Sequence, residues 1–366
     1  MTTLILKPTD ACNANCRYCS AASAAPSRNL GPELLQKIFT LFGDWSRRFD
    51  GNHLKLIWHG GEPLLMPPEF WEQAFRLEDE CLTKRGIALE QGIQTNATRI
   101  TSETLPILQR MLGRLGTVGT SYDPMPGIRE LKGEREGAYA EQWEAAMGLL
   151  RGAGIRYGIL YVVHRASLPH LKEIYARFRQ QHPESGLRFN PLYRQGRAAQ
   201  TGSWEDLGIT SEEWGRALIE LHGAWEADGR PGNVLPFGPW WRLHQKGHWG
   251  LSCECSGKCV DSHFGVGPDG SVYLCGRSSD GGTFRFGSVV DLDIEALHAH
   301  PHRQLLANRL VFLRRTTCRD CPWWLYCHGG CVNDGLLASG SPLAPTGFCA
   351  GLRSYFEAVF ARESAS

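Results

Sequence analysis

The sequence predicts an α/β fold made of repeated βα units, followed by a separate cysteine-rich region. Short runs rich in β-branched and aromatic residues alternate with longer segments of helical periodicity over the first half of the chain. The chain also has 13 cysteines, nine of which lie between Cys253 and Cys349. Because 366 residues exceed the size at which a single hydrophobic core stops growing, we expect a large α/β domain and a smaller cysteine-rich one.

The predicted strands and helices alternate strictly. We expect strands at residues 3–7, 54–58, 89–94, 117–121, 157–163 and 187–191, and helices at residues 32–49, 69–85, 102–115, 137–152 and 167–181. Parallel neighbours need a crossover connection, so this alternation predicts a parallel sheet with helices outside it. An open doubly wound sheet and a complete or partial βα barrel both satisfy the pattern. In both, active sites lie at the carboxyl ends of the strands.

Side chains capable of chemistry follow the predicted strands at that end. A cysteine cluster at 12–19 follows the first strand, and the segment 59–63, with the sequence HGGEP, follows the second. Asn96 follows the third strand, and Ser121 and Asp123 follow the fourth. The sequence therefore predicts one pole of the sheet that collects the chemistry.

Residues 201–250 have a different composition, which is helical and rich in tryptophan: Trp204, Trp214, Trp225, Trp240, Trp241 and Trp249. Tryptophans of this kind suit peptide contact or packing between domains. We expect three regions, namely a catalytic core at 1–200, a helical bridge at 201–250 and a cysteine-rich region at 251–366.

Charge and composition exclude several classes of protein. The formal net charge is +1, which argues against a nucleic-acid or anionic-membrane partner. No apolar run reaches the roughly 18–20 residues that span a bilayer, and the N-terminus lacks the features of a secretory signal. We therefore expect a cytoplasmic protein with no membrane partner. In a reducing compartment, clustered cysteines indicate metal binding or catalysis rather than disulfides.

The spacing Cys12-x3-Cys16-x2-Cys19 places three thiols on one short loop. Thiolates suit iron–sulfur clusters and zinc. Zinc sites usually combine two CxxC pairs, and no second pair lies nearby in the sequence. The pattern favours a four-iron cluster with three protein ligands, which leaves one iron open for a cofactor or substrate.

The sequence CNANCRYC, which includes Tyr18, resembles the CxxxCxxC signature of the radical S-adenosylmethionine (SAM) superfamily. The resemblance implies that Cys12, Cys16 and Cys19 hold a 4Fe–4S cluster whose open iron chelates SAM. Reductive cleavage of SAM then gives a 5′-deoxyadenosyl radical that abstracts hydrogen from a substrate. The resemblance also implies a partial (β/α)6 TIM-like barrel and an external reductant such as flavodoxin or ferredoxin.

Further segments resemble motifs of the same family. GGEP at 60–63 is similar to the segment that contacts the SAM amino group, and QTNA and GTSYD are similar to the ends of the third and fourth strands. Tyr122 and Pro124 depart from the fourth-strand motif. The resemblance also predicts that Arg129 binds the SAM carboxylate. The segment around Arg129 lacks the His and Asp of the family's motif, so a position on a solvated loop is the alternative for this side chain. The implied SAM-binding residues are Tyr18, Gly60, Gly61, Glu62, Asn96, Ser121, Asp123 and Arg129.

No catalytic residue is assigned with certainty, but two side chains are candidates. His59 stands where relatives often carry Gln. A contact with substrate or cofactor is one role for this side chain, and a packed histidine at the end of a strand is the other. Cys255 lies among predicted cluster ligands, where it donates a hydrogen atom, binds substrate or is a spare neighbour.

The C-terminal cysteines follow the spacing Cys259-x10-Gly270-x4-Cys275, then Cys318-x2-Cys321-x5-Cys327-x3-Cys331, then Cys349. A zinc ribbon is one explanation of the CxxC pair. Behind a radical SAM triad, however, the order resembles the SPASM extension, which implies two auxiliary 4Fe–4S clusters and three clusters in all. The implied ligand sets are Cys253, Cys259, Cys275 and Cys331 for the first, and Cys318, Cys321, Cys327 and Cys349 for the second. Cys253 is chosen over Cys255 because the five-residue gap to Cys259 resembles anaerobic sulfatase maturases.

Families of this architecture chiefly modify ribosomally synthesised peptides and proteins, so the resemblance implies a peptide maturase that crosslinks its substrate or makes a related change. Sulfatase maturases, which make formylglycine, carry an Asp base where this chain has Gly276, although Asp280 could supply a carboxylate. Oxidation of a small-molecule alcohol and a non-catalytic metal-binding scaffold are further alternatives. Since the triad begins at Cys12, we expect a peptide substrate to need a separate binding protein, or else recognition by the tryptophan-rich bridge and the barrel mouth.

Overall fold

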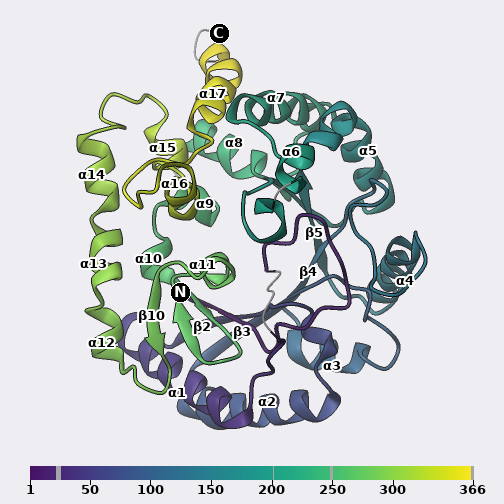
Figure 1. Cartoon of the computed structure of the whole chain (residues 1–366), viewed down its shortest axis with the longest axis vertical. Helices are drawn as coiled ribbons and strands as arrows, with labels where there is room; N and C mark the ends of the chain where they lie inside the picture. Colours follow the sequence, from purple (N-terminus) through teal and green to yellow (C-terminus); the bar gives the residue numbers. More distant parts are fainter. Residues whose placement is uncertain (22–25, 201, 248–249, 364–366) are drawn as a thin grey trace. The chain divides into compact units, whose positions relative to one another are not determined.

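The computed structural model (Figure 1) describes residues 1–21, 26–200, 202–247 and 250–363. The chain forms two compact units, each assembled from two stretches. Unit 1 comprises Met1–Gly158 and Val260–Gln304, and unit 2 comprises Ile159–Cys259 and Leu305–Ser366. The predicted division into functional regions is different, because each region is one continuous stretch: 1–200, 201–250 and 251–366. This division stays a prediction.

Unit 1 is built on a predominantly parallel sheet with the strand order β10-β9-β8-β1-β2-β3-β4. The parallel pairs join β1 to β2, β2 to β3, β3 to β4 and β1 to β8, while β9 pairs antiparallel with both β8 and β10. The strands are β1 Thr2–Leu6, β2 His53–Trp58, β3 Ala88–Thr95, β4 Thr117–Ser121, β8 His263–Val266, β9 Ser271–Tyr273 and β10 Arg285–Ser288. The prediction of a parallel α/β sheet is confirmed.

The helices of unit 1 confirm the predicted alternation and refine its boundaries. The predicted helix at 69–85 ends at Cys81, because Leu82 leaves the helical region and a 3₁₀ turn follows. The predicted helix at 102–115 ends at Leu112, where Gly113 has a positive φ. The helices are α1 Pro32–Phe49, α2 Pro68–Cys81, α3 Leu105–Leu112, α4 Ala138–Gly152, α11 Gly276–Gly281 and α12 Ile294–His298. The short helices α10 Cys259–Ser262 and α13 Pro301–Ala307 lie where the chain passes from one unit to the other.

Unit 2 contains the strands β5 Tyr157–Val163, β6 Gly186–Pro191 and β7 Val234–Leu235 in that order. Its longest helices are α5 Leu171–Gln181, α7 Ser211–Ala227, α8 Phe237–Lys246 and α17 Cys349–Glu363. Its shorter helices are α6 Ser203–Leu207, α9 Cys253–Ser256, α14 Arg309–Arg315, α15 Trp324–Cys327 and α16 Val332–Ser339. The predicted strands at 157–163 and 187–191 and the predicted helix at 167–181 are therefore present.

The tryptophan-rich stretch supplies much of the core of unit 2. Trp214, Trp225 and Trp240 are buried. Trp240 packs edge-on against Phe356 of α17 at 5.0 Å and donates a hydrogen bond to the Tyr326 carbonyl at 3.0 Å. These side chains therefore stabilise the unit itself rather than lying open for a peptide. Trp249 lies outside the described residues.

Within the described residues, no helix has the length and apolar character needed to cross a membrane.

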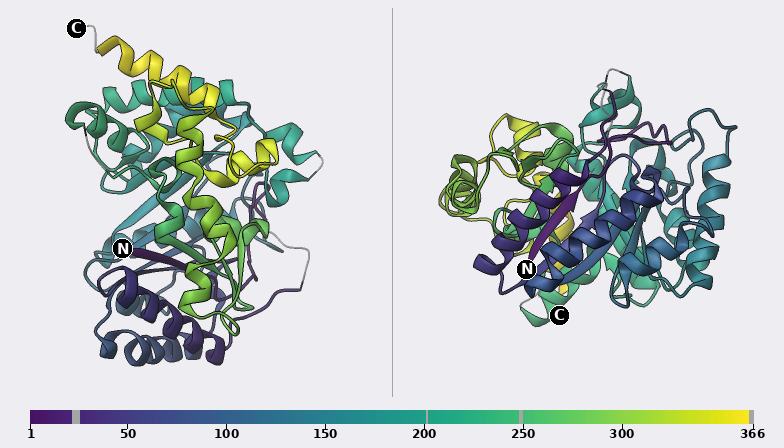
Figure 2. Two further views of the ribbon diagram at one scale, coloured as in Figure 1. Left: turned by 90° about the vertical axis from the view of Figure 1, so that its left-hand side faces the viewer. Right: turned by 90° about the horizontal axis from the view of Figure 1, so that it is seen from below.

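Helices α7 and α17 pack closely in unit 2 (Figure 1), and in the left-hand view of Figure 2 the yellow α17 again lies against teal helices. Two glycines make this approach feasible, because a Cβ atom added at Gly351 would lie 1.8 Å from the Ser211 carbonyl oxygen. A Cβ atom at Gly215 would lie 2.7 Å from the Gly351 oxygen. The contact is therefore made by backbone against backbone, with no room for a side chain.

We predict that Gly351→Ala lowers the free energy of unfolding by about 1–3 kcal/mol, because the added methyl group forces the two helices apart. The matched control is Gly223→Ala in α7, where nothing lies within 4 Å of the new Cβ. That variant should be stabilised by about 0.5–1 kcal/mol. Anaerobic urea unfolding measures both, and equal stability of the two variants would contradict the prediction.

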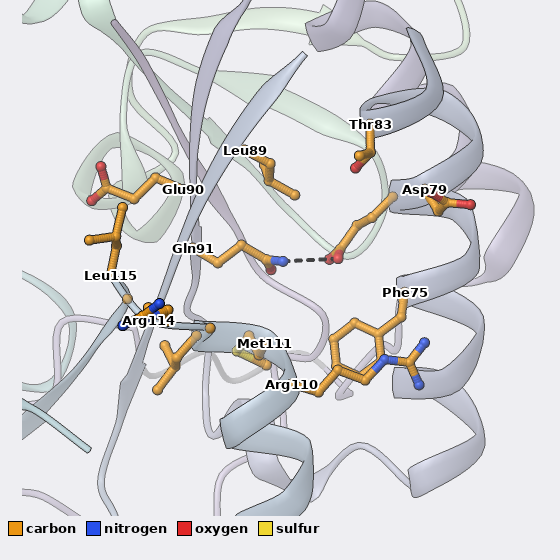
Figure 3. A pocket seen from close by; sticks show the side chains of 14 residues that line it. Phe75, Asp79, Thr83, Leu89, Glu90, Gln91, Arg110, Met111, Arg114 and Leu115 are labelled. Atoms are coloured by element: carbon orange, nitrogen blue, oxygen red, sulfur yellow. Dashed lines mark hydrogen bonds between the residues drawn. The ribbon is translucent and has the colours of Figure 1, made fainter. Parts of the chain in front are cut away.

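A cavity of about 460 Å³ lies at the amino ends of β3 and β4, bordered by α2 and α3. Figure 3 shows Gln91 extending toward α2, where its amide donates a 2.9 Å hydrogen bond to the buried Glu78 carboxylate. Burial raises the pKa of Glu78 to about 8. Because parallel sheets place catalysis at the opposite strand ends, this cavity is not the candidate active site.

The raised pKa of Glu78 makes stability depend on pH. The carboxyl titrates near 4.5 in the unfolded chain and near 8 in the folded one, so the folded protein holds more protons between these values. Stability should therefore fall as pH rises through this window, by up to about 1.4 kcal/mol per pH unit. Glu78→Gln removes this loss. Urea unfolding at pH 5.5 and 7.5 should show the variant gaining on the wild type, and parallel pH profiles would refute the prediction.

Candidate active site

The three N-terminal cysteines lie on the segment that follows β1, and none of them forms a disulfide bond. Cys16 is buried, whereas Cys12 and Cys19 are partly exposed. The backbone of the segment is hydrogen-bonded to residues 128–132: Asn15 N–H donates to the Glu130 carbonyl at 2.7 Å, and Arg17 N–H donates to the Ile128 carbonyl at 3.0 Å. A distant segment that carries Arg129 therefore holds the cysteine loop in place.

The GGEP segment after β2 holds the other side of the same loop. Gly61 N–H donates to the Thr9 carbonyl at 3.0 Å, and Glu62 N–H donates to the Ala11 carbonyl at 2.7 Å. A Cβ atom at Gly61 would lie 2.1 Å from the Ala11 oxygen. In the structure, Gly61 is thus required by the approach of the protein's own backbone. The predicted contact of Gly60 and Gly61 with SAM stays a prediction.

The Glu62 carboxylate links the ends of β2 and β3. It is fully buried and accepts hydrogen bonds from Thr95 Oγ1 at 2.7 Å, Asn96 N–H at 2.8 Å and Leu64 N–H at 3.0 Å. Burial raises the pKa of Glu62, and these hydrogen bonds act in the opposite direction. Since a carboxylate has about four acceptor positions, Glu62 retains capacity for another donor.

Asn96 connects this network to the cysteine loop. Its side-chain amide lies 3.9 Å from Cys12 Sγ and donates to Asn13 Oδ1 at 2.8 Å. Its side-chain oxygen accepts from the Thr98 N–H at 2.9 Å. The predicted site residues Glu62, Asn96 and Cys12 are therefore neighbours in the structure.

Arg129 lies at the centre of a second network in unit 1. Its guanidinium donates to Tyr18 Oη at 3.0 Å, to the Ser121 carbonyl at 3.0 Å and to Tyr139 Oη at 2.7 Å. The Tyr18 hydroxyl in turn donates to Asp123 at 3.2 Å. Arg129 is therefore half-buried and bonded on several sides, which excludes the solvated-loop environment. Its predicted role in binding the SAM carboxylate is untested.

The departure Tyr122 in the fourth-strand motif also has a structural reason. Its ring is buried and stacks on Trp143 of α4 at 4.2 Å. Tyr122 thus packs helix α4 against the end of β4.

His59 belongs to a group of charged side chains beside the cysteine loop. Lys7 and Asp280 form an ion pair in which each side chain is only 5% exposed, and Ser20 Oγ donates to Asp280 at 2.9 Å. Burial lowers the pKa of His59, Asp280 raises it and Lys7 lowers it further. His59 Nδ1 accepts from the Gly60 N–H at 2.7 Å, so it bonds locally as a strand-end histidine does.

Burial keeps thiols of the cysteine loop protonated in the absence of a metal centre. Burial raises the pKa of Cys12 to about 11 and also raises that of Cys19, so both are held as thiols. Thiols of this kind become thiolate ligands only when a metal centre displaces their protons. In the part of the chain that the structure describes, no three His, Cys, Asp or Glu side chains converge on a position for a metal ion. The ligand roles therefore stay predictions.

In unit 2, four of the predicted auxiliary ligands are mutual neighbours. Burial raises the pKa of Cys327 to about 12, and the neighbouring Cys349, Cys321 and Cys318 raise it further. Burial also raises the pKa of Cys318, with smaller contributions from Cys349 and Cys321. This group is the predicted second set.

The residues of the predicted first auxiliary set are divided between the two units. Cys253 is exposed, whereas Cys255 is buried and lines a small cavity together with Cys331. Cys275 lies in unit 1, where its thiol accepts a hydrogen bond from the Ser278 N–H that begins α11. The choice between Cys253 and Cys255 is untested.

Sequence reasoning missed several residues that organise the site. Tyr139 donates to the Ser121 carbonyl at 2.8 Å from within a helix, and Asn13 donates to Thr98 Oγ1 at 2.9 Å. Lys7 directly follows β1, and its place in the sequence predicts only an ordinary strand residue. For Asn13 and Lys7, the only indication in the sequence of a role at the site is that they lie close to the cysteine triad.

The chain is similar in sequence to proteins of known function. The family model of the radical SAM superfamily matches residues 6–177. The chain is 25% identical over 367 residues to the serine-type anaerobic sulfatase-maturating enzyme of Klebsiella aerogenes, covering 98% of this chain and 85% of the relative. It is also 25% identical over 372 residues to the cysteine-type enzyme of Clostridium perfringens, covering 98% and 96%.

Solved structures share the fold. The structure of anSMEcpe with bound AdoMet has a TM-score of 0.82 at 22% identity, covering 100% of this chain and 99% of the other. The structure of Streptococcus suis SuiB bound to its precursor peptide SuiA has a TM-score of 0.64 at 14% identity, covering 95% and 75%. Combined with the arrangement of the cysteine loop and the GGEP segment at the strand ends, these matches show an enzyme that carries a radical SAM domain at residues 6–177 and has the fold of the anaerobic sulfatase-maturating enzymes.

Proposed function

We propose that this enzyme uses a SAM-derived radical to modify a residue of a ribosomally made peptide or protein. The observation that carries the proposal is the linkage of Cys12, Asn96 and Glu62 at the ends of adjacent parallel strands. Peptide substrates are supported by the named activities of the relatives and by a solved structure of anSMEcpe with AdoMet and the Kp18Cys peptide.

Membership of the superfamily implies SAM and one 4Fe–4S cluster as cofactors. When bound, the reduced cluster would supply the electron for reductive cleavage of SAM, and SAM would supply the 5′-deoxyadenosyl group. Cys12, Cys16 and Cys19 would hold the cluster. Glu62 would accept from the SAM ammonium, and Arg129 would pair with the SAM carboxylate, since each charge matches its partner. Asn96, Ser121 and Asp123 would complete the pocket.

The C-terminal cysteines would hold two auxiliary 4Fe–4S clusters, as the SPASM-like spacing implies. The mutual proximity of Cys318, Cys321, Cys327 and Cys349 supports the second of these. The first would use Cys259, Cys275 and Cys331 with Cys253. An external reductant such as flavodoxin or ferredoxin would deliver electrons, and a separate protein would bind any leader peptide.

For the reaction on the substrate, we favour crosslinking or a related carbon-centred change. The carboxylate that sulfatase maturases use is absent at Gly276, and a Cβ atom there would lie 2.9 Å from Ile5 Cγ2 of β1. A larger residue at 276 would therefore require β1 and α11 to shift. This packing supports glycine as the residue suited to the site.

Oxidation of a substrate Ser or Cys to formylglycine is the second candidate, and Asp280 is the observation in its favour. Asp280 lies one helical turn beyond Gly276 on α11 and is buried beside Lys7 and Ser20. A buried carboxylate at this position could accept the proton that oxidation releases. The curated relatives along nearly the whole chain carry this activity in their names.

We predict that Cys12→Ala, Cys16→Ala and Cys19→Ala each reduce 5′-deoxyadenosine formation to background, because each removes a ligand of the cleaving cluster. The matched control is Cys81→Ala in α2, a buried cysteine outside every predicted ligand set. The assay is anaerobic incubation of reconstituted protein with SAM and dithionite, followed by chromatography. SAM cleavage by the triad variants would disprove the assignment.

Asp280→Asn separates the two candidate reactions. If formylglycine is the product, the variant should still cleave SAM while peptide oxidation falls roughly 10²–10⁴-fold, the typical contribution of a general base. The control is Asp291→Asn, which removes an exposed carboxylate from the same unit. Mass spectrometry of a Ser- or Cys-containing sulfatase peptide gives the readout. Absence of an aldehyde product from the wild type would exclude the formylglycine reaction.

A further inference from the structure

The cavity of about 460 Å³ between α2 and α3 in unit 1 has a buried carboxylate in its lining. This carboxylate belongs to Glu78, which is 5% exposed, and its Oε2 atom accepts the 2.9 Å hydrogen bond from Gln91. The second oxygen, Oε1, is also buried and has no hydrogen-bond partner among the residues that the structure describes. One half of the carboxylate is therefore left without a donor.

The neighbouring Gln91 side chain is held in a fixed orientation. Its oxygen accepts a 3.1 Å hydrogen bond from Trp58 Nε1, while its nitrogen donates to Glu78. An unpaired buried oxygen is energetically costly, and the cavity provides space for a donor from outside the protein. Because the terminal torsion of a glutamate has a broad minimum, the Glu78 carboxylate can turn to present an oxygen to a bound group.

The other charged side chains around the cavity do not supply that donor. Three of them are already in ion pairs, namely Asp79 with Lys84, Glu90 with Lys55 and Arg110 with Glu72. The fourth, Arg114, is exposed to solvent. In the part of the chain that the structure describes, no basic side chain forms an ion pair with Glu78. The site therefore lacks a cation rather than an anion.

The remaining lining of the cavity is largely apolar. Figure 3 shows Leu89 on one side of the Gln91 side chain and Phe75 and Met111 on the other. The Phe75 ring already has the Arg110 guanidinium 4.4 Å from its centroid, so its surroundings tolerate positive charge. A ligand that matches this lining has a positively charged nitrogen with N–H donors and an apolar body.

We propose that this cavity binds a small organic amine whose ammonium group pairs with Glu78 and whose apolar body lies against Phe75, Leu89 and Met111. A hydrogen bond between an ammonium group and a carboxylate is one of the stronger kinds in proteins. The cavity lies at the amino ends of β3 and β4, so the proposal is independent of the radical reaction. Since burial raises the pKa of Glu78 to about 8, the amine must displace a proton when it binds at neutral pH.

The experiment is isothermal titration calorimetry of the anaerobically reconstituted protein with benzylamine, a cation at neutral pH, and with benzyl alcohol as the matched neutral probe. Benzylamine should bind with a dissociation constant of about 1 mM or tighter, and benzyl alcohol at least about tenfold more weakly. Titrations at pH 7 in two buffers of different ionisation enthalpy should show that benzylamine binding releases a proton. The affinity should rise from pH 6 to pH 7 by up to about tenfold, because fewer Glu78 carboxyls are then protonated.

Glu78→Gln should weaken benzylamine binding at least about tenfold and abolish the proton release, because the amide cannot carry the negative charge. The matched control is Glu80→Gln, which removes an exposed carboxylate of α2 that does not line the cavity and should bind like the wild type. Equal affinity of the wild type for the two probes, or unchanged benzylamine binding in Glu78→Gln, would overturn the proposal. Absence of benzylamine binding to the wild type would also overturn it, with an ordered water then serving Glu78. The wild-type titrations are decisive even where Glu78→Gln does not fold.

Discussion

The close approach of residues 9–11 to residues 60–62 is the constraint on which the candidate site depends. Two backbone hydrogen bonds hold these segments together, and Gly61 leaves no space for a side chain between them. The same approach directs the Glu62 carboxylate to the end of β3, where Asn96 meets Cys12. One steric requirement therefore couples the cysteine loop to three strand ends.

Buried charge is compensated in different ways across the molecule. Lys7 and Asp280 neutralise each other, and Glu62 is surrounded by N–H and O–H donors. Arg309 instead has carbonyl acceptors and nearby thiols. The first two arrangements stabilise the apoprotein by themselves.

Much of the fold followed from local patterns. Strand and helix periodicity predicted the six parallel strands, because side-chain burial repeats at intervals of 2 and 3.6 residues. The spacing of the cysteines predicted which thiols belong to one site, because ligands on the same loop are close in sequence. The same reasoning missed Tyr139 and Lys7, since each acts on residues far away in the chain. It also gave no sign that Gly61 is required by the close approach of the Ala11 backbone, a neighbour that only the structure shows.

The sequence by itself predicted the chemistry of initiation, because the CxxxCxxC loop and the GGEP segment resemble motifs of the radical SAM superfamily. Only the tertiary structure decided how the charges around that chemistry are balanced. Asp280 is paired with Lys7 across 273 positions of sequence, and Arg309 reaches the carbonyls of Gly329 and Ala344. Electrostatic partners are selected by distance in space rather than along the chain, so a linear pattern contains no record of them.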